Sequence, residues 1–139
     1  MPVPESVQRM LDDDLASRSL GMRLVDAGEG HATVRMTVTD TMVNGHALAH
    51  GGYVFLLADT AFACACNSHG PVTVAAGADI TFVRPGRSGD VLMAEALERS
   101  RSGRNGIYDV TVFREVDGVR EIVAEFRGRS RSLADGQAL

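Results

Sequence analysis

The sequence predicts an α+β fold in which a curved antiparallel sheet wraps around one long buried helix. The first observation is that residues 51–68 are apolar on nearly every side, so a helix there needs cover all round. The second is that four strand-like segments follow it, separated by turn dipeptides. A strongly curved sheet supplies most of the cover, and we expect a second subunit to supply the rest.

The segments before the long helix predict one short helix and one half-buried strand. Residues 4–19 have a proline at the start and an apolar stripe at helical spacing, which predicts a helix. After a turn at residues 28–30, residues 31–40 alternate between apolar and polar side chains. The expected buried face of that strand is Ala32, Val34, Met36 and Val38.

The remaining chain predicts a loop, the long helix and an antiparallel meander of four strands. The loop covers residues 41–50, and His69-Gly70-Pro71 ends the helix. Asp117-Gly118 is a two-residue hairpin signal between the last two strands. The strands are expected at residues 72–83, 90–99, 106–116 and 119–131. We expect a single domain over residues 1–139, with a core over about residues 20–132 and a frayed tail at residues 133–139.

Composition is that of an ordinary soluble globular protein, with 45% hydrophobic and 23% charged residues. The net charge of −4 argues against a dedicated nucleic-acid binder. Once Asp59 is counted, no apolar run reaches the roughly 18 residues of a membrane helix, so we expect no membrane partner. The first five residues lack a signal-peptide pattern, which favours a cytoplasmic location. Cys64 and Cys66 are expected to be small reduced core residues.

All fourteen basic residues are arginine, and ten of them lie from Arg84 onward. A GC-rich genome that encodes arginine in place of lysine explains the bias, and bidentate phosphate contacts are a second explanation that can hold alongside it. The arginine-bearing turns at residues 84–87 and 101–106 are therefore either solvated loops or a phosphate cradle.

Asp59 is the single charge in the predicted buried helix, and a lone buried carboxylate is costly unless it is paired or used in chemistry. Gly51 and Gly52 leave bare backbone N–H groups at the helix start, where they can stabilise developing negative charge. The alternatives are that Asp59 caps a loop or pairs with an arginine, and that the glycines only permit a tight turn. Eight residues separate Gly51 from Asp59, which is roughly 12 Å of helix. One carbonyl cannot contact both in one chain, so two antiparallel copies at a two-fold axis are expected to share each site.

The loop before the helix offers two further candidates. His46 and His50 have the i, i+4 spacing of a zinc pair, but no third ligand is evident, and we expect no metal. His50 is expected to order the loop or to contact substrate. Asn44 either donates its amide to a substrate carbonyl or forms a turn with Gly45.

Several segments carry a family resemblance. Residues 43–68, VNGHALAHGGYVFLLADTAFACACNS, closely resemble the hotdog-fold acyl-CoA thioesterases, and the nearest subgroup is the phenylacetic-acid-degradation thioesterase. Residues 79–90, 106–110 and 127–131 also resemble that family. The resemblance implies dimers that pair into tetramers and hydrolysis of aryl- or medium acyl-CoA thioesters. Phenylacetyl-CoA or hydroxyphenylacetyl-CoA is the favoured substrate, and no metal or redox cofactor is implied.

The resemblance also implies roles for individual residues. Asp59 would be the nucleophile or general base, Gly51 would supply the oxyanion N–H, and Asn44 and His50 would line or order the substrate loop. The implied substrate and CoA contacts are Leu48, Gly52, Tyr53, Phe55, Leu56, Thr60, Arg84, Pro85 and Arg104.

One departure from the family concerns the strand that would face Asp59. Relatives often carry serine or threonine near the position of Ala76-Gly77, and this chain has no hydroxyl there, unless Thr60 or Thr73 substitutes.

Two rival functions follow from the same residues. A hotdog hydratase or dehydratase would need a histidine partner for Asp59, and a non-catalytic acyl-CoA-binding protein would not need Asp59.

Overall fold

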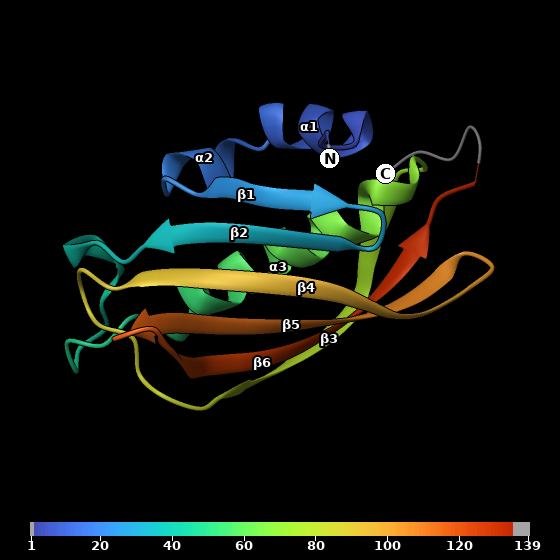
Figure 1. Cartoon of the computed structure of the whole chain (residues 1–139). Helices are drawn as coiled ribbons and strands as arrows, with labels where there is room; N and C mark the ends of the chain where they lie inside the picture. The colour runs from blue at the N-terminus through green and yellow to red at the C-terminus, as the bar shows by residue number, and fades with distance from the viewer. Residues whose placement is uncertain (1, 135–139) are drawn as a thin grey trace.

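The computed structural model describes residues 2–134 and contains one sheet, one long helix and short helices around them (Figure 1). The predicted frayed tail lies outside the described residues from residue 135 onward. The helices are α1 (Glu5–Asp12), α2 (Leu15–Ser19) and α3 (Gly51–Cys66), with 3-10 turns η1 (Asp40–Met42) and η2 (Asn67–His69). The strands are β1 (Arg23–Gly28), β2 (His31–Thr37), β3 (Thr73–Phe82), β4 (Val91–Ser102), β5 (Asn105–Val116) and β6 (Val119–Ser132).

The six strands form one antiparallel sheet in the order β1-β2-β4-β5-β6-β3, and α3 lies against its inner face (Figure 1). This confirms the predicted α+β fold with a central helix. The predicted four-strand meander is wrong: β4, β5 and β6 form a meander, but β3 pairs with β6. Local alternation specifies a strand but not its neighbour. The eight residues between Phe82 and Val91 are long enough to carry the chain from one edge of the sheet back to β2.

The single helix expected at residues 4–19 is also wrong, because the chain breaks between α1 and α2. Asp13 ends α1, and the Asp14 side chain accepts the Ser17 N–H at 3.0 Å as the N-cap of α2. Aspartate is a favoured N-cap, so this residue starts a new helix. The break also turns Leu15 out to solvent, where it is 71% exposed, while Val7 is buried in the core.

The core lies between the sheet and α3. The predicted inner face of β2 is buried, as are Cys64 and Cys66, which are free thiols. Burial raises the pKa of each cysteine to about 12, so both remain protonated, unreactive core residues. Gly128 on β6 permits a close contact of sheet and helix, since a Cβ there would lie 2.7 Å from the Phe62 ring.

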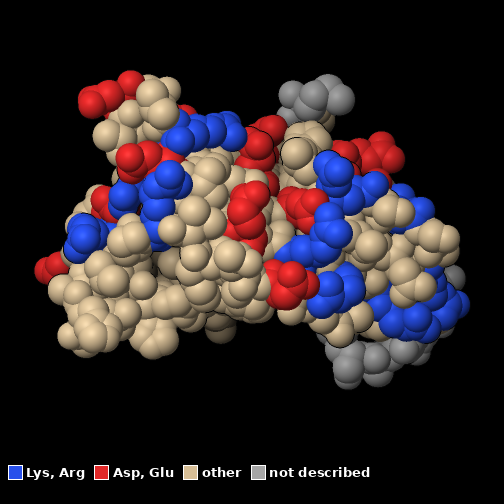
Figure 2. Space-filling model, turned by 90° about the horizontal axis from the view of Figure 1, so that it is seen from below, with Lys and Arg blue, Asp and Glu red and all other residues tan. Residues whose placement is uncertain are grey.

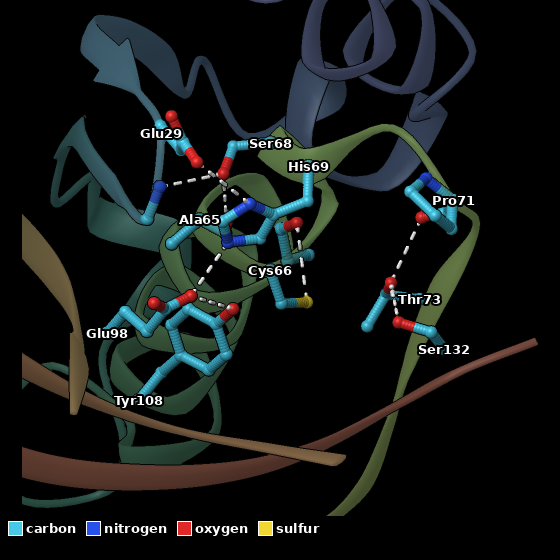
Figure 3. A network of polar contacts seen from close by, with 12 residues as sticks. Glu29, Ala65, Cys66, Ser68, His69, Pro71, Thr73, Glu98, Tyr108 and Ser132 are labelled. Atoms are coloured by element: carbon cyan, nitrogen blue, oxygen red, sulfur yellow. Dashed lines mark hydrogen bonds and ion pairs between the residues drawn. The ribbon is translucent and has the colours of Figure 1, made fainter. Parts of the chain in front are cut away.

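A polar network anchors the C-terminal end of α3 to the sheet (Figure 3). Glu98 on β4 contacts His69 Nε2 at 2.7 Å and accepts a hydrogen bond from the Tyr108 hydroxyl at 2.8 Å. Burial acts to raise the pKa of Glu98, but these hydrogen bonds outweigh it and hold the pKa below its ordinary value. Burial and the bond to Glu98 raise the pKa of Tyr108. These contacts therefore fix the C-terminal end of α3 against β4 and β5.

Two smaller observations complete the fold. Asp117 and Gly118 have φ values of 52° and 78°, which confirms the two-residue hairpin turn between β5 and β6. None of the helices within residues 2–134 is long and apolar enough to cross a membrane.

Candidate active site

A groove of about 330 Å³ opens at the N-terminal end of α3, where the loop before the helix meets the connection from β3 to β4. It brings together five residues that the sequence singled out: Asn44, Leu48, Gly51, Arg84 and Pro85. The other lining residues are Ala49, Val54, Phe82, Val83, Gly86 and Val123. The groove is therefore mostly apolar, with an amide, a bare helix N-terminus and a guanidinium at its edges.

Backbone hydrogen bonds hold the loop against its neighbours. The Ala49 N–H donates to Gly86 O at 2.8 Å, and the His50 N–H donates to Met42 O at 2.8 Å. Val43 and Ala49 form an isolated antiparallel bridge that closes the loop on itself. Residues 43–50 are thus a compact loop of fixed shape, which positions the start of α3.

Asn44 orders the loop with one end of its side chain and leaves the other end available. Its Oδ1 accepts the His46 N–H at 2.8 Å and the Leu48 N–H at 3.2 Å. The enclosed turn holds Ala47 at a φ of 60°, a left-handed conformation that costs energy for a residue other than glycine. Across the described residues, the Asn44 NH₂ has no acceptor. Both roles considered for Asn44, loop ordering and amide donation, are therefore compatible.

His50 and the two glycines divide the helix start between them. His50 is the N-cap of α3, and its Nδ1 accepts the Gly52 N–H at 3.0 Å, a contact that fits the loop-ordering alternative. The Gly51 N–H has no acceptor within the part of the chain that the structure describes, and Gly51 lines the groove. A Cβ at Gly51 would lie 3.0 Å from the Phe82 ring. A larger residue at position 51 would therefore displace the Phe82 ring and crowd the N–H.

Asp59 lies two turns further along α3 and does not line this groove. It is half-buried, and its carboxylate has no hydrogen bond or ion pair with any residue from 2 to 134. Burial raises its pKa, and the negative charge of Asp14 raises it further. Within residues 2–134, Asp59 therefore neither caps a loop nor pairs with an arginine, the two alternatives considered for it. The partly exposed residues of α3 with helical spacing are Gly52, Phe55, Leu56, Asp59 and Ala63. Asp59 therefore lies on a stripe of α3 that residues 2–134 leave partly uncovered.

The two threonines considered as substitutes for the missing hydroxyl are both committed elsewhere. Thr60 is 4% exposed, and its hydroxyl lies 2.9 Å from that of Ser17 on α2. The Thr73 hydroxyl donates to Pro71 O at 3.0 Å and contacts the Ser132 hydroxyl at 2.8 Å (Figure 3). Ala76 sits at a bulge of β3 next to Gly77. Neither threonine reaches the groove in one chain.

The remaining predicted contacts are dispersed. Tyr53 packs on the core and meets the His50 ring edge-on, with ring centroids 6.4 Å apart. Arg84 donates to Ile122 O at 3.0 Å at the groove, whereas Arg104 lies in the β4–β5 turn at the opposite end of the sheet (Figure 1). One chain therefore does not bring Arg84 and Arg104 to the same ligand. Basic side chains gather toward the right-hand end of the molecule in Figure 2, and its lower left is largely uncharged.

Sequence reasoning missed the apolar half of the groove. Phe82 and Val83 are 53% and 48% exposed, and with Val123 they form its apolar wall. A signal was present, since two large apolar residues stand directly before the Arg84-Pro85 turn. A larger hollow of about 650 Å³ surrounds Arg114, but Asp90 and Glu121 neutralise that guanidinium. Arg87, from the turn at residues 84–87, is the one residue of the predicted candidates among its lining residues.

Comparisons with known proteins bear on this site. A family model described as the Thioesterase superfamily matches residues 46–121, which include the second half of the loop, α3 and the β3–β4 connection. Acyl-coenzyme A thioesterase PaaI of Escherichia coli K12 is 43% identical over 129 residues, or 93% of this chain and 90% of that protein.

Solved structures agree with the fold along most of the chain. The structure of the E. coli PaaI protein from the phenylacetic acid degradation operon has a TM-score of 0.90 at 42% identity, covering 94% of this chain and 92% of that one. The structure of smu.793 from Streptococcus mutans UA159 bound to acetyl CoA has a TM-score of 0.76 at 26% identity, covering 81% and 88%.

Proposed function

This chain belongs to the thioesterase superfamily, as the resemblance to hotdog-fold thioesterases predicted, and we propose that it is an acyl-CoA thioesterase whose active site is shared between two subunits. The observation that carries the proposal is the separation of two incomplete halves. The groove of one chain holds an open Gly51 N–H, and the unpaired Asp59 lies roughly 12 Å away along α3.

A two-fold axis beside α3 would complete both halves at once. Two antiparallel copies of α3, in contact along their uncovered stripes, would place the Gly51 end of each near Asp59 of the partner subunit. The same contact would cover Phe55 and Leu56, which are partly exposed in one chain. The outer edge of β3 has no strand neighbour within the described chain, so it too is open to a second copy.

In this site the thioester carbonyl would rest against the Gly51 N–H, with the Asn44 amide as a second donor. Both donors would stabilise the oxyanion of the tetrahedral intermediate. Asp59 of the partner subunit would either attack the carbonyl carbon or take a proton from the attacking water. Either route ends with hydrolysis to a free acid and the CoA thiol.

The substrate would be a CoA thioester with an aryl or medium acyl group, and phenylacetyl-CoA or a hydroxylated form of it is the favoured candidate. The E. coli relative named acyl-coenzyme A thioesterase supports CoA esters as a class, as does the S. mutans relative bound to acetyl CoA. Leu48, Phe82 and Val83 offer an apolar wall, and Arg84 offers a cation for a phosphate. We propose a cytoplasmic homodimer or a dimer of dimers.

The first test is release of free thiol from a panel of acyl-CoA esters. Wild-type protein is expected to hydrolyse aryl and medium acyl esters, and Asp59→Asn is expected to lose at least about a hundredfold in kcat, the scale of a general base. Full activity of Asp59→Asn would refute the mechanism. Binding of acyl-CoA without hydrolysis by the wild type would identify a binding protein instead.

A subunit-mixing experiment tests the shared site. Asp59→Asn chains are refolded together with Gly51→Pro chains, in which the proposed N–H donor is absent. Each mixed dimer would contain one doubly altered site and one intact site, so random mixing is expected to restore about a quarter of wild-type activity. If each site belonged to one chain, the mixture would remain as inactive as its components.

A further inference from the structure

We propose that Asp14, at the start of α2, is a positioning residue for Asp59, acting through a buried hydrogen-bonded chain and as a neighbouring negative charge. The inference rests on the proposed role of Asp59. It assigns a function to the break between α1 and α2.

The hydrogen-bonded chain begins at the N-cap of α2. The two Asp14 carboxylate oxygens accept from Ser17, one from its N–H at 3.0 Å and the other from its hydroxyl at 2.7 Å. The Ser17 hydroxyl lies 2.9 Å from that of Thr60, the residue next to Asp59 on α3. Ser17 and Thr60 are only 3% and 4% exposed. The chain therefore ties α2 to the turn of α3 that carries Asp59.

The direction of these hydrogen bonds follows from counting protons. A serine hydroxyl has one hydrogen to donate, and Ser17 gives it to Asp14. Thr60 must then donate to Ser17. Every donor in the chain thus points toward Asp14, whose carboxylate is the final acceptor. A fixed rotamer of Asp14 results, since both its oxygens are engaged.

Asp14 and Asp59 influence each other electrostatically. Burial is the main cause that raises the pKa of Asp59, and the charge of Asp14 is the second. The same charge contributes to the raised pKa of Cys64, one turn beyond Thr60. The charge of Asp14 therefore acts on the flank of α3 that runs from Asp59 to Cys64. A carboxylate with a raised pKa is a stronger base, provided that it is still ionised at the working pH.

Within residues 2–134, no positively charged side chain is bound to this pair, although Arg18 and Arg23 line the same hollow as Asp14 and Thr60. On α3 itself the titratable neighbours are Cys64 and Cys66, and both are protonated thiols. On α2, Arg18 donates to Asp12 O. The strand residues in the buried core are apolar or small apart from Tyr108, which is bound to Glu98 at the far end of α3. Within residues 2–134, no arginine or histidine forms an ion pair with Asp14 or Asp59.

The test compares Asp14→Asn with Asp13→Asn. Asparagine is also a good N-cap, so Asp14→Asn keeps the start of α2; it removes the charge and puts an NH₂ donor in place of the oxygen that accepts from the Ser17 hydroxyl. Asp13 is exposed and lies one residue away, so its variant removes the same formal charge without touching the chain. The primary readout is a carbon-13 NMR pH titration of the aspartate carboxyl groups, in which the Asp59 signal is identified by its absence in Asp59→Asn. The second readout is the acid limb of the kcat/KM profile.

The expected result is that the Asp59 midpoint and the acid limb both move to lower pH in Asp14→Asn and stay in place in Asp13→Asn. An Asp59 midpoint that does not move in Asp14→Asn would overturn the inference, even if the enzyme is active. A protein that hydrolyses no thioester but shows the shift would refute the proposed function and leave the coupling intact. Thr60→Val offers an independent check: it breaks the chain and keeps both charges, so kcat should fall while the midpoint stays. An unchanged kcat would show that the chain does not position Asp59.

Discussion

Replacing Gly51 by alanine tests whether substrate approaches the helix N-terminus through the groove. A Cβ at this position would lie 3.0 Å from Phe82 Cζ, and two further ring carbons would lie at 3.3 and 3.5 Å. The ring is 53% exposed, so it can turn away, and the added methyl group would then occupy the groove beside the N–H. The backbone donor itself is retained.

Two opposing terms set the stability of this variant. Alanine is favoured over glycine within a helix by up to about 1 kcal/mol. Overpacking typically costs about 1–3 kcal/mol, and the lower end applies because the ring can move. The net change in the free energy of unfolding is therefore expected to be within about 1 kcal/mol. Activity should fall much further, by about a hundredfold, which is the scale for loss of one oxyanion contact.

The assay measures urea unfolding and kcat/KM for Gly51→Ala, with Gly45→Ala as the control. Gly45 lies in the same loop and does not have a positive φ, and a methyl group added there would meet no atom within 4 Å, so its variant should be neutral in both measurements. Adding Phe82→Leu to Gly51→Ala should relieve the ring contact and restore stability but little of the activity, with Phe82→Leu alone completing the cycle. Full activity of Gly51→Ala would refute the proposal that the carbonyl rests against this N–H.

Three further predictions follow from the described contacts. His50→Ala should cost about 0.5–2 kcal/mol of unfolding free energy and should also lower activity. His50→Asn restores a capping acceptor and should recover both. Equal losses in the two variants would show that the cap is not the cause. At pH values above the ordinary glutamate pKa of 4.5, Glu98→Gln should lower the free energy of unfolding by about 1–3 kcal/mol. The pKa of Glu98 is depressed in the folded protein, so wild type loses this contribution only as the pH falls through that lower value. Parallel plots of unfolding free energy against pH for the two proteins would contradict this. Gly128→Ala should destabilise by about 1–3 kcal/mol, since its methyl would lie 2.7 Å from the Phe62 ring, and calorimetry of the double variant with Phe62→Leu should show partial recovery.

The elements of the fold follow from local patterns, whereas their neighbours do not. Alternation on β2 and the all-round apolar character of α3 predict a strand and a buried helix, because each signal depends on side chains a few residues apart. The pairing of β3 with β6 depends on contacts about fifty residues apart, such as Asp79 with Arg129. The break at Asp13-Asp14 was open to prediction, because aspartate favours N-caps, but three consecutive aspartates do not say which one caps.

The residues of the candidate site likewise fall into those that the sequence singled out and those that it did not. By residue type alone, Asn44, Gly51 and Arg84 each have an ordinary structural explanation in a turn, a helix start or a solvated loop. The resemblance of their segments to the hotdog thioesterases is what made them candidates. Phe82 was missed although it stands just before the Arg84-Pro85 turn, because an exposed phenylalanine at the end of a strand looks like any surface apolar residue until the groove is seen. Asp14 could not be predicted, because its effect on Asp59 depends on how α2 packs against α3, which no local pattern encodes.

Burial of α3 and completion of the site have a common physical cause. A helix that is apolar on all sides cannot be covered by one curved sheet, and the stripe left over here includes the only carboxylate in the helix. In one chain that carboxylate carries the cost of partial burial and of a neighbouring charge, with no partner in residues 2–134 to offset it. A second copy would cover the apolar part of the stripe and bring a helix N-terminus toward the carboxylate. Because a helix N-terminus favours a negative charge, assembly would stabilise the ionised form of Asp59, which both routes of hydrolysis require.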